Sequence, residues 1–122
     1  MKKILIIEDE IAYLNVLRDK LTRENYTVMY ANDGKRGLAM SLNEKPDLIL
    51  LDIRLPLMDG LTMLNMLREN DWGKNANVII LTNLEDSKSI SSAMHGIISK
   101  YIVKSETSPD SLIKDIKIIL KE

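Results

Sequence analysis

Residues 48–52 constrain the fold of this chain more than any other stretch. Four apolar residues in a row, Leu48-Ile49-Leu50-Leu51, are followed by Asp52 and then by the turn-forming residues Pro56 and Asp59-Gly60. An unbroken apolar run with turn residues close behind it predicts a strand that is buried on both faces. Because an ionised carboxylate is costly to bury without a partner, we expect Asp52 at the carboxyl end of this strand, in contact with water, a cation or both.

The same pattern recurs along the chain. Residues 4–7, 78–81 and 101–103 are further predicted strands, and the weakly alternating residues 26–31 predict an edge strand. Helical patterns alternate with these strands. The predicted helices run from Ile11 to a close at Asn25, from 35 to about 43, from Gly60 to near Asn70, after Ser87, and from Pro109 behind the cap residue Ser108.

Strands that alternate with helices, and that are apolar on both faces, predict an α/β fold with a parallel sheet between two helical layers. Right-handed crossovers restrict the strand order, and the flavodoxin-like, doubly wound (βα)5 order 2-1-3-4-5 fits best, because it puts the weakest strand at an edge. In the first helix, Ile11, Leu14, Leu17 and Leu21 are expected to share the buried face.

From the length and composition we expect one domain, 1–122, with no output domain in it, which suits either a stand-alone protein or part of a longer one. Lys+Arg 17 nearly balance Asp+Glu 18, which gives no support for an extended nucleic-acid or membrane-binding surface. Cys 0 excludes disulfides and thiolate metal sites. No apolar run is long enough for a signal peptide or a membrane span. We therefore expect a cytoplasmic protein that binds neither nucleic acid nor membranes directly.

Polar residues follow four of the five predicted strands. They are Glu8 and Asp9 after the first strand, Asp52 after the third, Thr82 after the fourth and Lys104 after the fifth. In the predicted order they all meet at one edge of the sheet. Three carboxylates cannot share a small site while ionised unless a cation offsets their repulsion, and a set of oxygen ligands suits Mg²⁺ or Mn²⁺. With an ammonium and a hydroxyl beside the ion, the site can support an aspartyl-phosphate on Asp52.

These residues resemble the receiver domain of two-component response regulators, and the likeness covers essentially the whole chain. The matching residues are the acidic pair Glu8-Asp9, the phospho-acceptor Asp52 with its D-x-x-x-P-x-M-D-G loop, the switch hydroxyl of Thr82, the switch aromatic Tyr101, and Lys104. Any one of these matches is weak, whereas five matches in order are specific.

The resemblance implies that a histidine kinase or a phosphotransfer protein donates a phosphoryl group to Asp52 in a Mg²⁺-dependent reaction, in which Mn²⁺ can substitute. It implies that Asp9, Asp52 and the backbone carbonyl of Arg54 ligate the metal, while Glu8 acts through water. The domain is then a signalling module and not a metabolic enzyme, beyond assisting its own phosphoryl transfer and slow dephosphorylation.

The resemblance also implies a conformational switch. Thr82 turns inward to hydrogen-bond the phosphoryl group, and Tyr101 follows into the vacated space. This shift remodels the face made by the fourth helix, the fifth strand and the fifth helix, where a downstream protein or a second copy of the chain binds.

The chain departs from the family pattern near the site. Ser105 follows Lys104 where the family usually has Pro, so a trans peptide bond is expected there. Asn83 stands where small residues are usual, and we expect it to narrow the access of small phosphodonors to Asp52. Arg54 is placed to shield the phosphoryl group, and Leu84 cannot orient an attacking water. These positions predict slow self-dephosphorylation.

Other interpretations of these residues remain open. The acids at 8–10 suit the N-terminus of the following helix, and Tyr101 suits ordinary strand packing. A small Mg²⁺-dependent phosphohydrolase would also use Asp52 as its nucleophile, but such enzymes usually carry a second acid at the position of Arg54. A receiver that serves only as a docking surface, without phosphorylation, is a further alternative, against which the retained Asp52, Thr82 and Lys104 argue.

Overall fold

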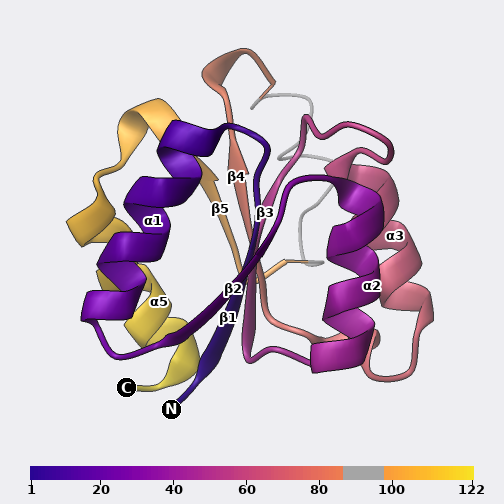
Figure 1. Ribbon diagram of the computed structural model, residues 1–122, viewed down its shortest axis with the longest axis horizontal. Helices are drawn as coiled ribbons and strands as arrows, with labels where there is room; N and C mark the ends of the chain where they lie inside the picture. Colours follow the sequence, from indigo (N-terminus) through magenta and orange to yellow (C-terminus); the bar gives the residue numbers. More distant parts are fainter. Residues whose placement is uncertain (87–97) are drawn as a thin grey trace.

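The computed structural model describes residues 1–86 and 98–122, which form a parallel sheet between layers of helices (Figure 1). All five strands are parallel, in the order β2-β1-β3-β4-β5, which confirms the predicted order. Strand β2, much of which is only partly buried, lies at an edge as expected. The strands are β1 (Lys3–Ile7), β2 (Thr27–Ala31), β3 (Leu48–Asp52), β4 (Val78–Thr82) and β5 (Lys100–Val103).

Helices cover both faces of the sheet. Figure 1 shows α1 (Ile11–Arg23) and α5 (Pro109–Leu120) on one side, and α2 (Gly34–Glu44) and α3 (Gly60–Glu69) on the other. Ser108 caps α5, accepting a hydrogen bond from the backbone N–H of Ser111, and Pro109 is the first helical residue, as predicted. The helix predicted after Ser87 lies outside the described residues. Within the described ranges, no helix has the length and apolar character needed to span a membrane.

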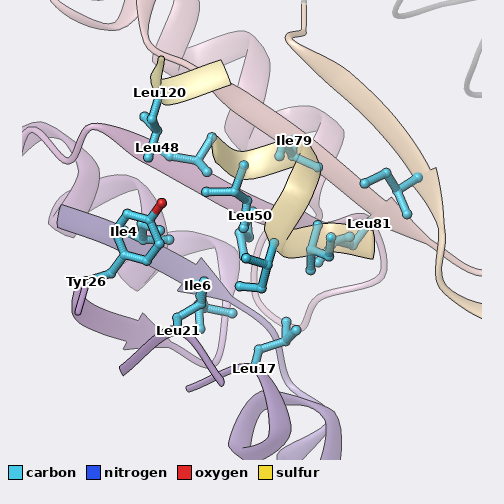
Figure 2. Packing of buried hydrophobic residues seen from close by; sticks show 14 of the residues in the cluster. Ile4, Ile6, Leu17, Leu21, Tyr26, Leu48, Leu50, Ile79, Leu81 and Leu120 are labelled. Atoms are coloured by element: carbon cyan, nitrogen blue, oxygen red, sulfur yellow. The ribbon is translucent and has the colours of Figure 1, made fainter. Parts of the chain in front are cut away.

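The core consists of two apolar clusters, one on each face of the sheet. Alternate residues of β1, β3 and β4 point to opposite faces, and nearly all of these side chains are fully buried. Figure 2 shows the cluster under α1 and α5, which includes Ile6 and Leu50 from neighbouring strands together with Leu17 and Leu21 of α1. This burial on both faces explains why the strands appear as unbroken apolar runs in the sequence.

The predicted buried face of α1 is wrong at one residue. Leu14, Leu17 and Leu21 are buried, but Ile11 is 54% exposed. Ile11 is the first residue of the helix. Its side chain therefore lies at the end of the apolar stripe, beside the carboxyl edge of the sheet, and more than half of it remains exposed.

The loop after β3 is packed closely against the strand that precedes it. A Cβ atom on Gly60 would lie 2.1 Å from the carbonyl oxygen of Asp52, so only glycine fits there. The Gly60 N–H donates to the carbonyl oxygen of Ile53 at 2.8 Å. Asp59 caps α3, its carboxylate accepting a hydrogen bond from the backbone N–H of Thr62 at 2.9 Å. These contacts fix the position of Asp52 relative to α3.

Candidate functional site

The carboxyl ends of β1 and β3 bring three acidic residues together. Ile7 and Leu51 are paired in the sheet, so the residues that follow them, Glu8 and Asp52, lie on neighbouring strands. One carboxylate oxygen from each of Glu8, Asp9 and Asp52 lies within 4.8 Å of the other two. Glu8 and Asp52 are 1% and 5% exposed, whereas Asp9 is exposed to solvent. The structure confirms the prediction that these acids lie close together, at the point where the strand order reverses.

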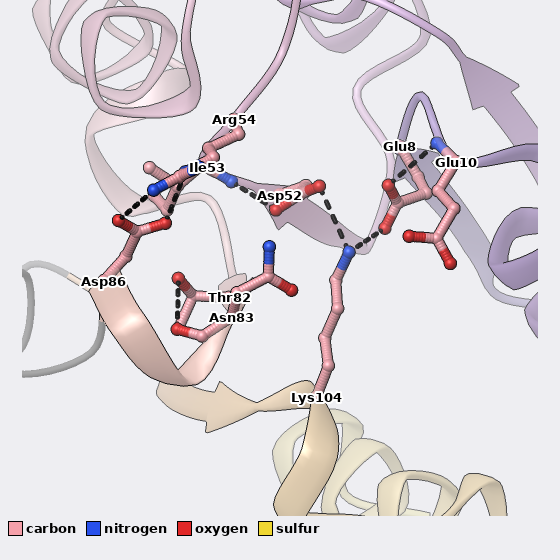
Figure 3. Close-up of polar contacts among 9 residues, drawn as sticks. All are labelled: Glu8, Glu10, Asp52, Ile53, Arg54, Thr82, Asn83, Asp86 and Lys104. Carbon is pink, nitrogen blue, oxygen red and sulfur yellow. Dashed lines mark hydrogen bonds and ion pairs between the residues drawn. The ribbon is translucent and has the colours of Figure 1, made fainter.

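Lys104 reaches the acidic cluster from the far edge of the sheet. It follows β5 directly, at the start of the short 3₁₀ helix η3 (Lys104–Glu106). Figure 3 shows its side chain extending to Glu8 and Asp52. Its Nζ donates hydrogen bonds to Glu8 Oε1 at 2.5 Å and to Asp52 Oδ2 at 3.1 Å. Only 11% of the side chain is exposed, so both ion pairs are largely shielded from water.

Hydrogen bonds from the backbone fix the orientation of both buried carboxylates. Asp52 Oδ1 accepts the N–H of Ile53 at 2.7 Å, which leaves Oδ2 facing Lys104. Glu8 Oε2 accepts the N–H of Glu10 at 3.1 Å, which leaves Oε1 facing the same ammonium. The local backbone therefore determines which oxygen of each carboxylate faces Lys104.

Burial and charge pairing shift the pKa values of Glu8 and Lys104. The pKa of Glu8 is raised to about 7, chiefly because burial disfavours its charged form; the hydrogen bond from Lys104 opposes the shift and the charge of Asp52 adds to it. Burial acts to lower the pKa of Lys104, but its hydrogen bonds and charge pairing with Glu8 and Asp52 outweigh that effect and raise the pKa overall. The lysine thus stays charged between two carboxylates.

The residues present fit a hard divalent cation. Glu8, Asp9 and Asp52 supply only carboxylate oxygens, which Mg²⁺ and Mn²⁺ prefer. One ammonium offsets only part of the charge that three ionised carboxylates carry, so the cluster favours a further cation. The exposure of Asp9 leaves one side of the cluster open to solvent. The backbone carbonyl of Arg54 as a ligand, and Glu8 acting through water, stay predictions.

Thr82 and Asn83 end the strand next to Asp52. Leu81 is paired with Asp52 in the sheet, and Thr82 follows it, fully buried. The Thr82 hydroxyl donates a long hydrogen bond, 3.4 Å, to the carbonyl oxygen of Asn83. The Asn83 carboxamide points toward the side of Asp52 and Lys104 in Figure 3. Its position agrees with the expected effect on access, although the effect itself stays a prediction.

Tyr101 lies in β5, opposite Ile80 of β4. Its side chain is half-buried and packs with the apolar cluster on the α2 and α3 side of the sheet. This contact agrees with the interpretation of Tyr101 as strand packing, so its part in a switch stays a prediction. Among the described residues no peptide bond is cis, which confirms the expected trans bond between Lys104 and Ser105.

Two contacts near the site were not predicted from the sequence. The guanidinium of Arg54 forms a bidentate ion pair with Asp86, with Nε to Oδ2 at 2.7 Å and Nη2 to Oδ1 at 2.9 Å (Figure 3). The ring centroid of Tyr13 lies 4.7 Å from Nζ of Lys104. The only sequence signal for the first contact is that both residues follow neighbouring strands. The predicted effect of Leu84 concerns a side chain outside the described part of the chain.

Comparison with known families identifies the domain. The model of the response regulator receiver domain family matches residues 4–117. The chain belongs to this family. The match extends from β1 into α5, so it reaches all five strands and includes every acidic residue of the cluster.

Curated relatives show the same relationship. The chain is 39% identical over 83 residues, 68% of its length, to the response regulator PleD of Caulobacter vibrioides, of which it spans 18%. It is 33% identical over 119 residues, 98% of its length, to the transcriptional regulatory protein ResD of Bacillus subtilis, of which it spans 48%. It is 32% identical over 100 residues, 77% of its length, to sporulation initiation phosphotransferase F of the same organism, of which it spans 79%. The chain thus spans less than half of the length of PleD and ResD.

Solved structures share the fold. A putative response regulator from Chloroflexus aurantiacus superimposes with a TM-score of 0.89 at 25% identity, covering 99% of this chain and 98% of that one. The receiver domain of the sensor histidine kinase PA1611 from Pseudomonas aeruginosa, solved with a magnesium ion coordinated in its active site cleft, superimposes with a TM-score of 0.88 at 22% identity, covering 99% and 98%. The second likeness shows the fold alone.

Proposed function

We propose that this receiver domain accepts a phosphoryl group on Asp52 from a histidine kinase or a phosphotransfer protein, in a Mg²⁺-dependent reaction. The observation that carries the proposal is that Lys104 bridges Glu8 and Asp52 while Asp9 lies within reach of both carboxylates. The site therefore joins a nucleophile, a set of oxygen ligands and a positive charge within one small volume.

Asp9, Asp52 and the backbone carbonyl of Arg54 would hold Mg²⁺, or Mn²⁺ in its place, with Glu8 acting through water. When bound, the ion would neutralise charge on the phosphoryl oxygens. This assignment rests on the acidic cluster and on the family's metal dependence. Among the described residues, Lys104 is the only one that forms an ion pair with Asp52.

The residues of the chain perform the transfer itself. One carboxylate oxygen of Asp52 attacks phosphorus and forms an O–P bond, while the N–P bond of the donor phosphohistidine breaks and its electron pair leaves with the imidazole nitrogen. Because the Ile53 N–H holds Asp52 Oδ1 and Lys104 binds Oδ2, the carboxylate is oriented before the donor arrives. Lys104 then stabilises the negative charge on the transferred group.

The acyl phosphate then biases a packing switch. The buried Thr82 hydroxyl, which makes only a long hydrogen bond to Asn83, exchanges that bond for one to the phosphoryl group. Tyr101 follows into the space that Thr82 leaves. A hollow of about 240 Å³ beside Tyr101, between β5 and α5, belongs to the face where we expect a downstream protein or a second copy to bind.

The phosphohydrolase alternative receives less support. Its usual second acid would occupy the position of Arg54, but Arg54 is a cation whose guanidinium is engaged by Asp86. The assignment of the domain as a signalling module agrees with its family. We propose that the domain hydrolyses its own aspartyl phosphate only slowly.

Intact-protein mass spectrometry tests the proposed function. The protein is incubated with phosphoramidate and Mg²⁺, and we expect the wild type to gain the mass of one phosphoryl group. Asp52→Ala should gain none, and neither should the wild type in excess chelator. Asp71→Ala, which removes a solvent-exposed acid in the loop after α3, is the matched control and should be labelled like the wild type. Equal labelling of wild type and Asp52→Ala would contradict the proposal.

A further inference from the structure

Lys104 has a third neighbour besides the two carboxylates. The aromatic ring of Tyr13, in the first turn of α1, lies with its centroid 4.7 Å from Lys104 Nζ. An ammonium within about 6 Å of a ring centroid, over the ring face, is attracted by the quadrupole of the ring. The contact joins helix α1 to the end of β5, two elements that are far apart in the sequence.

The low exposure of the Lys104 side chain increases the importance of its contact with the Tyr13 ring. A lysine side chain has a long, flexible stem, and it loses rotamer freedom when its amine is held at one place. Because only 11% of the Lys104 side chain is exposed, little water is available to solvate an N–H that faces away from Glu8 and Asp52. The ring supplies an attractive surface for the cation without adding another negative charge to the cluster.

The Tyr13 ring is itself well supported. Its side chain is half-buried and packs against the apolar cluster between the sheet and the helices α1 and α5. Helix α1 begins two residues after Asp9, so its first turn is anchored beside the acidic cluster. A ring held by packing on a helix is a more rigid neighbour than another flexible charged side chain would be.

We propose that Tyr13 is a positioning residue, whose ring holds the Lys104 ammonium beside Asp52 during phosphoryl transfer. The inference rests on the proposed function. As negative charge arrives on Asp52, the ammonium moves from Glu8 toward the phosphoryl oxygens. A cation–π contact depends less on direction than a hydrogen bond does, so the ring remains in contact throughout this movement.

The first test compares labelling rates of Asp52 by phosphoramidate at saturating Mg²⁺. Tyr13→Leu, which keeps an apolar side chain but removes the ring, is expected to slow labelling by about threefold to tenfold, the range that a partly shielded cation–π contact gives. Tyr13→Phe retains the ring and should label within about twofold of the wild type. Tyr30→Leu is the matched control. It also removes an aromatic ring from a cation, because Arg18 Cζ lies 4.2 Å from the centroid of the Tyr30 ring, but Tyr30 belongs to the edge strand β2, so the labelling rate should not change.

The second test asks whether Tyr13 acts through Lys104. A double-mutant cycle measures the effect of Tyr13→Leu on the equilibrium constant for unfolding, once in the wild type and once in Lys104→Met. We expect the effect to be about twofold to tenfold larger in the wild type, where the lysine is present. The inference is overturned if Tyr13→Leu labels like the wild type, if Tyr13→Phe is as slow as Tyr13→Leu, or if the cycle shows no coupling. If the wild type is not labelled at all, the proposed function fails, while the unfolding cycle still decides whether the ring holds the lysine.

Discussion

At the scale of single residues, the site is a balance of buried charges. Glu8 and Asp52 are nearly inaccessible to water, and one ammonium serves both of them. Removing one partner of a buried ion pair leaves an uncompensated charge, and the resulting loss of stability is larger than the net contribution of the intact pair to stability. The raised pKa of Glu8 reflects this environment: burial and the charge of Asp52 favour the protonated carboxyl, and the hydrogen bond from Lys104 offsets only part of their effect.

The pKa of Glu8 predicts how the stability of the metal-free protein depends on pH. Its pKa is raised from 4.5 to about 7 in the folded state, so the unfolded chain ionises this carboxyl first as the pH rises. The contribution of Glu8 to stability is fully present below pH 4.5 and is lost as the pH rises through 7, a loss of about 1–3 kcal/mol. We expect Glu8→Gln to lose less stability than the wild type from about pH 4 to about pH 8 in urea denaturation with chelator present, a range that includes both the unfolded and the folded pKa of Glu8. Identical pH dependence in both proteins would contradict this assignment.

The ion pair of Arg54 with Asp86 predicts the lifetime of the phosphorylated state. A phosphoryl group on Asp52 brings about −1.5 to −2 charges close to Arg54, where it competes with Asp86 for the guanidinium. Arg54→Ala should therefore shorten the lifetime by removing the shield, and Asp86→Asn should lengthen it by releasing Arg54 toward the phosphoryl group. The loss of phosphoryl mass with time, in Mg²⁺ and without a phosphatase, measures both. Equal lifetimes in the two variants and the wild type would show that this ion pair does not control hydrolysis.

At the scale of elements, the loop between β3 and α3 determines where Asp52 lies. Its end is defined by Gly60, which contacts the backbone of Asp52, and by the cap of α3 at Asp59. Leu57, within this loop, has a φ of 67° and is largely exposed, so the turn adopts a backbone conformation that is unfavourable for leucine. The end of the loop next to α3 is therefore held by its contact with the Asp52 backbone and by the helix cap.

Adding a methyl group at Gly60 tests this dependence. The new Cβ of Gly60→Ala would meet the carbonyl oxygen of Asp52 at 2.1 Å, and the backbone cannot move as a side chain can. We expect a loss of about 1–3 kcal/mol in the free energy of unfolding, together with slower labelling of Asp52. In the matched variant Gly37→Ala, the new atom meets the Cδ1 and Cγ2 atoms of the Ile7 side chain at 2.6 and 2.8 Å, which can shift more readily than a backbone carbonyl, and a gain in helix propensity of about 1 kcal/mol offsets part of the cost. A smaller loss for Gly60→Ala than for Gly37→Ala, measured by chemical denaturation, would refute the argument.

At the scale of the whole molecule, the sheet and its polar edge could be predicted from the sequence, whereas contacts between surface loops could not. The apolar runs at 48–51 and 78–81 identify buried parallel strands, and the handedness of crossovers leaves few possible strand orders. Once that order is known, the convergence of Asp52 and Lys104 follows, because Asp52 is the last residue of β3 and Lys104 comes directly after β5.

Other features depend on details that a linear pattern does not contain. The ion pair of Arg54 with Asp86 depends on the paths of two loops and on the rotamers of two side chains. The contact of Tyr13 with Lys104 depends on how helix α1 is rotated above the sheet. The exposure of Ile11 has a similar origin, because periodicity identifies the face of a helix but not how far its neighbours extend along it.

If these converging residues make Asp52 the phosphoryl acceptor, then the phosphoryl group must be found on Asp52 when the labelled protein is mapped residue by residue. The protein is labelled with phosphoramidate and Mg²⁺ and then reduced with borohydride, which converts an aspartyl phosphate to homoserine, and its peptides are analysed by mass spectrometry. We predict homoserine at position 52 of the labelled protein and none there when Mg²⁺ is omitted. Homoserine at another aspartate, with Asp52 unchanged, would contradict the account.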